Sequence, residues 1–182
     1  MSNNCFYDMR ITGKKKNVVE LLKMMQREDE YKHDGLGRIF DCVVVDEVPI
    51  EIADDNDVIE VDVCGDCANS IRGAMCSDGG YRQVCLESET KRLNLVVEAY
   101  SSEPGNGFQE HVLIDRGEML VNECVDYEEY DIQDYESLEE YNEKNGTDFT
   151  EDMVVDEYVH VGGFGDRYMQ YEYFKKEHFE EV

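Results

Sequence analysis

The chain has 182 residues, of which 44 are Asp or Glu and 17 are Lys or Arg, so its formal net charge is −27 at pH 7. Such a charge excludes direct binding to nucleic acid, because lysines and arginines are needed to displace counterions from a phosphate backbone. It also disfavours attachment to anionic membranes. The length fits one domain, or one domain with an appendage, and a hydrophobic content of 41% argues against a chain that is disordered throughout.

The N-terminus and the cysteines indicate a cytoplasmic protein. The first residues, Met-Ser-Asn-Asn-Cys, lack the basic and apolar regions of a signal peptide, and no apolar run reaches the roughly 20 residues that span a bilayer. In a reducing cytoplasm the seven cysteines are expected to be thiols rather than a disulfide framework. Cys5, Cys42 and Cys124 lie among strand-like apolar residues, so we interpret them as small core side chains.

The N-terminal part of the chain predicts a strand, a helix and a second strand. Residues 5–12 predict the first strand, which Gly13 ends. Residues 39–52 are rich in β-branched side chains and predict a strand that bends near Pro49. Between them, residues 14–29 predict a helix, because four apolar side chains recur at helical spacing on one face: Val18, Leu21, Leu22 and Met25.

The middle of the chain predicts two more strands and two short helices. Residues 58–63 alternate between apolar and polar side chains, which is typical of a half-buried strand. Residues 68–75 and 81–91 predict the helices, and residues 93–100 predict the next strand. The order of these elements indicates an α+β sandwich of ferredoxin-like β-α-β-β-α-β topology.

The sequence then predicts a hairpin. A strong turn signal at residues 103–107 precedes two strands, residues 108–115 and 118–125, which are expected to form an added β-hairpin. Residues 1–125 are thus predicted to be the ferredoxin-like core, and residues 126–182 an acidic C-terminal extension.

Two elements are predicted within that extension. Residues 134–144 are expected to be helical, with Leu138 and Tyr141 on a thin apolar stripe. Residues 168–174 alternate in aromatic side chains and predict a final strand that packs on the core.

Four cysteines are candidate metal ligands. Cys64, Cys67, Cys76 and Cys85 follow the spacing C-x2-C-x8-C-x8-C. Tetrahedral zinc takes four thiolate or imidazole ligands, two of which a C-x2-C turn can supply, so a structural zinc is one interpretation of this set. The others are buried thiols or a redox pair, although a thioredoxin-like unit around the pair is absent. Apart from the zinc alternative, we expect no cofactor.

The histidines do not indicate an active site. His33, His111, His160 and His178 have no Ser or Cys beside them in a nucleophile motif. We therefore expect that the protein is not an enzyme. An enzyme built on a ferredoxin-like scaffold is the alternative, since a fold does not set a function.

The acidic residues are concentrated in one stretch. Between Glu123 and Glu157 there are fifteen Asp or Glu residues and one basic residue, Lys144. Carboxylates at this density approach the charge spacing of a nucleic acid, which in a duplex is about one phosphate per 1.7 Å of axis. The stretch is therefore suited to a strongly basic partner, such as the nucleic-acid groove of a protein. The alternative is a solvated surface that only keeps the protein soluble.

The candidate partner-binding residues are the carboxylates at the centre of this stretch, with interleaved tyrosines adding contact area. They are Asp126, Glu128, Glu129, Asp131, Asp134, Glu136, Glu139, Glu140 and Glu143.

Several segments resemble a known family. Asn4-Cys5 leading into Ile11-Thr12-Gly13 and a helix is similar to the start of the YubB-type ferredoxin-like domain of plasmid and phage proteins. The run from Glu98 to Phe108 resembles its later part, as does Gly163-Phe164-Gly165. Together these segments span the greater part of the chain.

The chain also resembles type II anti-CRISPR proteins in its length, acidity and cysteine content. This resemblance implies a protein of a mobile element that acts in the bacterial cytoplasm. It would bind Cas9, or Cas9 loaded with guide RNA, and block the binding or cleavage of target DNA. A zinc-stabilised interaction module and an inhibitor of another DNA-binding defence protein are the alternatives.

Overall fold

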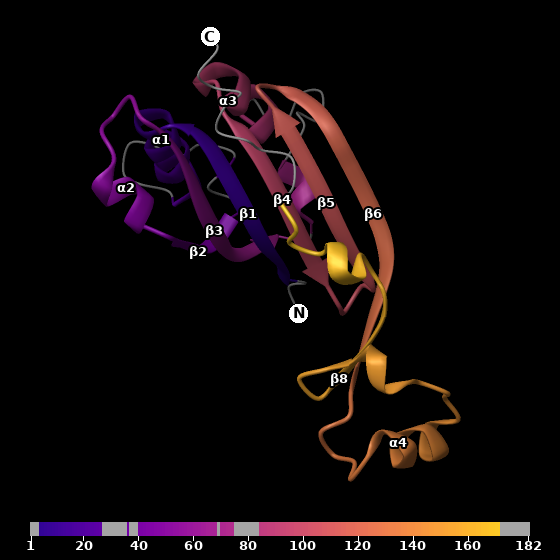
Figure 1. Ribbon diagram of the computed structural model, residues 1–182. Helices are drawn as coiled ribbons and strands as arrows, with labels where there is room; N and C mark the ends of the chain where they lie inside the picture. The colour runs from indigo at the N-terminus through magenta and orange to yellow at the C-terminus, as the bar shows by residue number, and fades with distance from the viewer. Residues whose placement is uncertain (1–3, 27–35, 37–39, 69, 75–83, 172–182) are drawn as a thin grey trace.

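The computed structural model describes residues 4–26, 36, 40–68, 70–74 and 84–171. These residues form one curled antiparallel sheet of eight strands, in the order β2-β3-β1-β4-β5-β6-β8-β7. Helices cover one face of the sheet, and a small lobe projects from one end of the molecule (Figure 1). None of the helices among the described residues has the length and apolar character needed to cross a membrane.

The N-terminal half of the sheet is built on β1 (Asn4–Lys14), which lies between β3 (Val58–Ala68) and β4 (Val96–Glu103). β2 (Phe40–Val45) pairs with the other side of β3. Successive side chains of a strand point to opposite faces of a sheet. One face therefore carries the core, to which β1 contributes Cys5, Tyr7, Met9 and Ile11.

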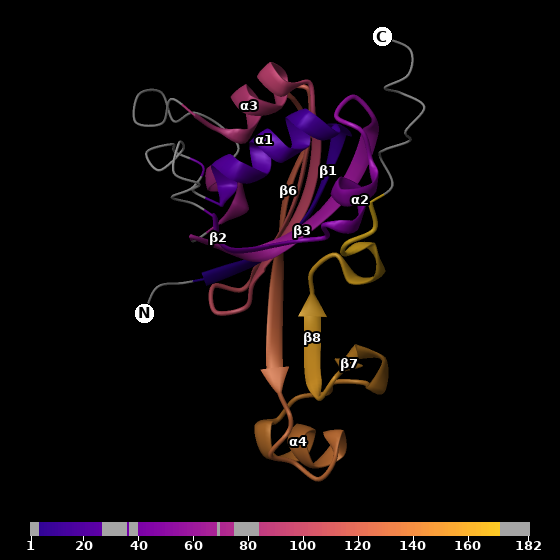
Figure 2. The same cartoon turned by 90° about the vertical axis from the view of Figure 1, so that its left-hand side faces the viewer.

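Two helices cover this core face. α1 (Lys15–Met25) buries the apolar face that the sequence predicts, and α3 (Leu86–Leu93) packs beside it (Figure 2). Arg92 of α3 joins the two helices, since its guanidinium lies 2.8 Å from a carboxylate oxygen of Glu20 in α1. The helix predicted over residues 14–29 is confirmed from Lys15 to Met25, and residues 27–29 lie outside the described residues.

The predicted hairpin is also confirmed. β5 (Phe108–Asp115) and β6 (Glu118–Asp131) are joined by Arg116 and Gly117, whose φ angles of 50° and 89° are those of a tight hairpin turn. β5 pairs with β4 on its other side and so extends the sheet. β6 is 14 residues long, and it pairs with β5 only as far as Asp126.

The remainder of β6 carries the lobe, which we define as residues 127–162. Here β6 pairs with β8 (Tyr158–Gly162), and β8 pairs with the short β7 (Val154–Val155). α4 (Leu138–Asn145) lies at the far end with both of its predicted apolar residues buried. The helix expected over residues 134–144 is thus confirmed from Leu138, whereas residues 134–137 are not helical.

The predicted ferredoxin-like β-α-β-β-α-β sandwich is wrong. The described residues form a mostly antiparallel, curled sheet of eight strands with few and short helices. The prediction failed because the β5–β6 hairpin is not an addition beside a finished core. It continues the sheet beyond β4, and β6 then pairs with β8. β6 also runs without a break through the domain boundary expected at residues 125–126.

Two local predictions need correction as well. The strand expected over residues 39–52 ends at Val45, and Pro49 lies in the first turn of α2 (Val48–Ile52). Proline is tolerated there because its missing N–H would have no partner within the helix. The first of the two short helices expected in the middle of the chain is a 3₁₀ helix, Ile71–Ala74.

The C-terminal segment covers the second face of the sheet, which is the face opposite α1 and α3. After β8 the chain forms a short 3₁₀ helix and then places Tyr168 and Tyr171 against Tyr100 of β4, with ring centroids 5.5 and 5.7 Å apart. The strand predicted over residues 168–174 is therefore wrong as far as Tyr171, and its remainder lies outside the described residues. The aromatic side chains do pack on the sheet, but they do so from a loop.

The lobe is attached to the main sheet at a contact of three segments, which we call the junction: Gly107, Asp126–Tyr127 and Gly162–Gly163. The amide of Tyr127 donates to the carbonyl of Gly107 over 2.9 Å, and the amide of Gly163 donates to the carbonyl of Asp126 over 2.8 Å. Gly162 has a φ of 78°, and a Cβ there would lie 2.5 Å from the carbonyl oxygen of Asp126. The junction therefore requires glycine at this position.

We predict that Gly162→Ala lowers the free energy of unfolding by about 2–3 kcal/mol, because it combines an unfavourable φ with a backbone overlap. Gly146→Ala is the matched control, since Gly146 has a φ of 68° but no atom within 4 Å of the position that a Cβ would occupy. The control should lose only about 1 kcal/mol. Urea unfolding measures both, and equal losses would contradict the steric role of the junction.

Candidate partner-binding surface

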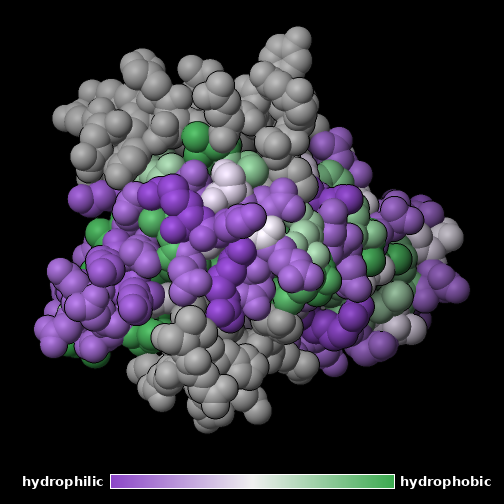
Figure 3. Space-filling view, turned by 90° about the horizontal axis from the view of Figure 1, so that it is seen from above, coloured by the Kyte–Doolittle hydropathy of each residue, from purple (hydrophilic) through white to green (hydrophobic). Residues whose placement is uncertain are grey.

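The surface of the molecule is dominated by polar side chains. Seen from above, hydrophilic residues cover most of the described surface, and hydrophobic residues form small separate patches (Figure 3). Large exposed apolar side chains do occur, for example Val48 and Ile52 of α2. Charge rather than apolar area is therefore the main property by which this surface can recognise a partner.

The lobe has a small core of its own. Val159 of β8 is fully buried and pairs in register with Tyr130 of β6. The rings of Tyr130, Phe149 and Tyr141 follow one another, with centroids 5.1 and 6.0 Å apart. Leu138 of α4 is buried as well. These contacts give the lobe enough apolar packing to hold its shape.

Hydrogen bonds from one amide side chain hold the loop after α4. Asn142 donates from Nδ2 to the carbonyl of Phe149 over 2.8 Å, and its Oδ1 accepts from the amide of Phe149 and the hydroxyl of Thr147. At the other end of α4, the Ser137 hydroxyl accepts from the amide of Glu140, which is the usual N-cap interaction. The lobe therefore has its own ring cluster and its own hydrogen-bond network.

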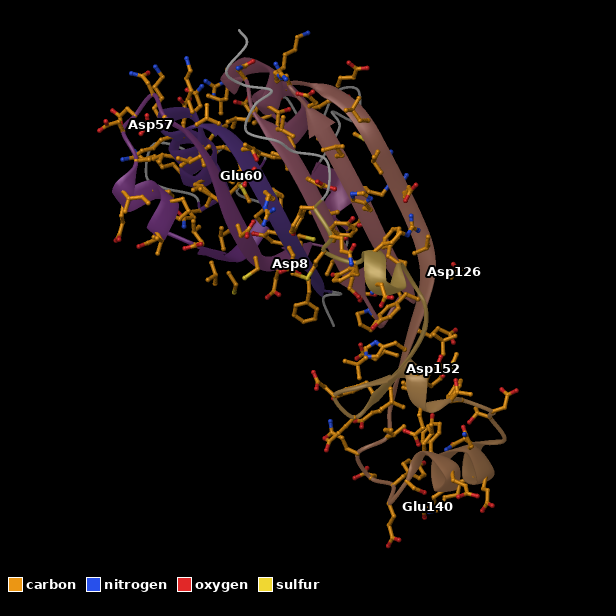
Figure 4. The ribbon with its side chains drawn as sticks, viewed as in Figure 1. Asp8, Asp57, Glu60, Asp126, Glu140 and Asp152 are labelled. Atoms are coloured by element: carbon orange, nitrogen blue, oxygen red, sulfur yellow. The ribbon has the colours of Figure 1, made fainter. Side chains whose placement is uncertain are left out.

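The structure brings the nine predicted partner-binding residues to one end of the molecule, along β6, the loop after it and α4. Figure 4 shows Asp126 where β6 leaves the main sheet and Glu140 on the far part of the lobe. Of the nine, eight are exposed and Glu140 is half-buried. The eight exposed residues are Asp126, Glu128, Glu129, Asp131, Asp134, Glu136, Glu139 and Glu143.

Few of these carboxylates have a cationic partner among the described residues. Lys144 Nζ lies 2.7 Å from a carboxylate oxygen of Glu140, and this hydrogen bond lowers the pKa of the Glu140 carboxyl. Glu129 accepts a hydrogen bond from the hydroxyl of Tyr127 over 2.8 Å and lies 3.7 Å from His160. Burial, together with that hydrogen bond, raises the pKa of Tyr127, so the phenol remains a donor. The other carboxylates on the lobe face solvent.

The fold adds carboxylates that the sequence prediction did not select. Five more exposed acidic residues lie in the loop after α4, its 3₁₀ helix and the β7–β8 turn: Asp148, Glu151, Asp152, Asp156 and Glu157. A groove of about 530 Å³ lies between α4 and this loop, and Leu138 and Phe149 are among its lining residues. Glu139, Glu143 and Glu151 also line it. These three carboxylates all belong to the acidic stretch of the sequence, but only the folded structure shows that Glu151 lies beside α4.

Most of the interleaved tyrosines pack inside the lobe rather than on its surface. Tyr141 is buried, and the ring of Tyr135 lies edge-on to it at 4.8 Å. Tyr127 is buried at the junction. The contact area expected from these rings is therefore largely used inside the lobe, and the carboxylates remain as the groups that can reach a partner.

The four cysteines considered as zinc ligands are not brought together where the structure describes them. Cys64 and Cys67 lie three positions apart in the continuous strand β3, so they point to opposite faces; Cys64 is exposed and Cys67 is buried. Cys85 is buried at the N-cap of α3, and Cys76 lies outside the described residues. Within the described part of the chain, no group of three or more metal-ligating side chains is found.

Of the three cysteines predicted in the core, only Cys5 is buried. It pairs across the strands with Cys67, and the hydrogen bond between the two thiols, together with burial, raises the pKa of Cys67. Cys42 is exposed because it lies in a bulge of β2, where side-chain alternation is interrupted. Cys124 is exposed because it lies on β6, at the free edge of the main sheet.

Two of the four histidines are described. His111 of β5 lies on the second face with its Nε2 2.9 Å from Glu98 Oε1. His160 of β8 contacts the hydroxyl of Tyr127 through Nδ1. Neither is hydrogen-bonded to a serine or a cysteine within the described residues, and His33 and His178 lie outside them.

We predict that Tyr141→Ala unfolds the lobe while the main sheet stays folded, because the lobe core would lose a ring that contacts both Tyr135 and Phe149. The local cost is about 3 kcal/mol. Hydrogen exchange should then show lost protection at Val159 and unchanged protection along β1. Tyr158→Phe, which keeps the ring of a half-buried side chain, is the control. Equal loss of protection in β1 would show that the lobe is no separate unit.

Two of the three segments that carry the resemblance to the YubB-type domain meet at the junction, whereas the first forms β1 in the main sheet. Gly107, at the end of the run from Glu98 to Phe108, and Gly163 both hydrogen-bond to the Asp126–Tyr127 step. Comparisons with protein-family models, curated proteins and solved structures find no match to this chain. Neither the resemblance to the YubB-type domain nor that to type II anti-CRISPR proteins is therefore supported by a relative.

Proposed function

We propose that the protein is a non-enzymatic inhibitor that inserts its lobe into the basic nucleic-acid groove of a CRISPR effector. The observation that carries this proposal is a charge concentrated on a folded, projecting lobe: between Glu128 and Glu157 there are thirteen acidic residues and one lysine. A surface of this sign competes with a phosphate backbone for the same arginines and lysines.

The shape of the lobe favours a concave binding site on the partner. The lobe is connected to the main sheet through β6 and β8 and lies beyond the end of that sheet (Figures 1 and 2). Its exposed carboxylates come from β6, α4 and the loops between them, so they do not share one flat face. A groove can contact several sides of such a lobe at once, whereas a flat surface contacts only one.

The folded state of the lobe also favours tight binding. Its ring cluster and the hydrogen bonds of Asn142 fix the loop and α4 in advance. Less conformational entropy is then lost on association than for a disordered acidic tail. The groove beside α4 offers apolar contact for the stem of an arginine or lysine and carboxylates for its charged end.

Cas9, loaded with guide RNA, is the candidate effector, and it comes from the resemblance to type II anti-CRISPR proteins alone. Its channel for the guide–target heteroduplex is positively charged, and arginines read the PAM. Either surface has the charge that the lobe requires. Another DNA-binding defence protein would present the same chemistry and is the second candidate.

We predict stoichiometric binding of the protein to Cas9–guide RNA in a pulldown, with loss of target DNA binding. The affinity should fall at least tenfold between about 0.05 and 0.5 M salt, because the contacts are between exposed charges. Effector that is already bound to target DNA should not be captured. Salt-independent binding would exclude mimicry of nucleic acid, and inhibition at a small fraction of the effector concentration would indicate an enzyme.

We predict that the triple variant Glu139→Gln, Glu143→Gln, Glu151→Gln weakens binding about 10–100-fold, since it removes the three carboxylates that line the groove beside α4.

The matched control changes the net charge by the same amount away from the lobe. Glu47, Glu51 and Glu60 are exposed acidic residues of the N-terminal half, and their replacement by glutamine should change the affinity less than about threefold. Equal weakening by both triple variants would assign the effect to net charge rather than to the lobe.

A further inference from the structure

A pocket of about 390 Å³ opens on the second face of the sheet, apart from the groove of the lobe. β4 and β5 supply Glu98, Tyr100, His111 and Leu113 to its lining, and the segment after β8 supplies Phe164 and Arg167. Its volume is in the range of small-molecule sites.

The pocket contains a buried carboxylate that is only half satisfied. Glu98 is 5% exposed, and its Oε1 lies 2.9 Å from His111 Nε2. Its Oε2 is buried and has no hydrogen-bond partner in the described part of the chain. Buried carboxylate oxygens are almost always hydrogen-bonded, so an N–H or O–H donor is missing at this position.

The walls around this carboxylate are aromatic and apolar. The rings of Tyr100 and His111 stack at 4.1 Å, and the ring of Phe164 stands edge-on to them at 5.8 and 6.0 Å. Leu113, which pairs in register with Glu98, adds an aliphatic wall. A buried anion among aromatic rings is the arrangement that selects an organic cation.

The cationic neighbours among the described residues leave Glu98 Oε2 without a donor, since His111 contacts only Oε1 and both nearby arginines are engaged elsewhere. Arg10 pairs in register with Glu98, but its guanidinium is held by Asp62 at 2.8 and 3.0 Å and lies over the ring of Tyr171. Arg167 is exposed and lies over the ring of Phe164, 5.5 Å from its centroid. Its charge is therefore screened by water, whereas that of Glu98 is not.

The geometry points to a binding site for the ammonium or guanidinium group of an organic cation. An N–H of the ligand donates to Glu98 Oε2, and its alkyl stem lies against Leu113 and Phe164. The strong negative charge of the chain raises the local concentration of such cations. The site is separate from the carboxylates of the lobe and does not depend on the function proposed for them. The cation is either a free amine or a lysine or arginine side chain of a protein partner.

Calorimetric titration of the full chain with n-butylguanidinium and n-butylammonium tests this site, with n-butanol as a neutral ligand of similar shape. At least one cation should bind saturably with 1:1 stoichiometry, and the alcohol should bind at least about tenfold more weakly. Equal binding of cation and alcohol, or no saturation up to about 50 mM, would overturn the proposal. This comparison uses the unaltered protein and so does not depend on the folding of a variant.

The variant Glu98→Gln keeps the shape of the side chain and removes its charge, and it should weaken cation binding at least about tenfold. Glu123→Gln is the control, because Glu123 is an exposed carboxylate opposite His111 on β6, and its replacement changes the net charge equally. The control should change binding less than about twofold. Unchanged binding in a folded Glu98→Gln protein would also overturn the proposal.

A competition experiment then identifies the source of the cation. If a side chain of the partner fills the pocket, n-butylguanidinium and Glu98→Gln should both weaken the complex with Cas9–guide RNA. If the ligand is a free amine, both should leave the complex unchanged while the calorimetric result stands.

Discussion

The backbone contact at the junction is the constraint on which the rest of the structure depends. One strand, β6, belongs to the main sheet up to Asp126 and to the lobe after it, and the chain returns from the lobe through Gly162 and Gly163 against that same step. The amide of Tyr127 holds the outgoing strand to Gly107, and the amide of Gly163 holds the returning segment to Asp126, so the lobe is attached to the main sheet on both sides of its base. The same return places Phe164, whose amide is held by Gln109, and the aromatic segment after it on the second face.

A strongly acidic lobe must fold against its own charge repulsion. Ring packing among Tyr130, Phe149 and Tyr141 contributes favourable free energy of folding. The uncharged side chain of Asn142 supplies hydrogen bonds to the backbone of the loop. Among the residues that the structure describes, Lys144 forms its ion pair with Glu140. The lobe therefore combines exposed carboxylates with an ordered backbone. In this it differs from a disordered acidic tail that only increases solubility.

Local patterns in the sequence predicted what depends on near neighbours. The apolar faces of α1 and α4 and the turn at Arg116-Gly117 follow from spacing and turn chemistry within a few residues, and the structure confirms them. The sheet could not be predicted in the same way, because the pairing of β6 with β5 and then β8 joins residues that are far apart in the chain. The pocket could not be predicted for the same reason, because His111 of β5 contacts Glu98 of the neighbouring strand β4, 13 positions earlier in the chain.

The continuity of β6 has a mechanical consequence. A force that pulls on the lobe runs along one strand that pairs with β5 at eight register positions and with β8 at five. Hydrogen bonds of a strand that is pulled along its axis are loaded in shear and share the force. The lobe is thus anchored through β6 along most of one edge of the main sheet. A force applied at the tip of the lobe is transmitted along β6 to β5 and β4, because no flexible linker lies between them.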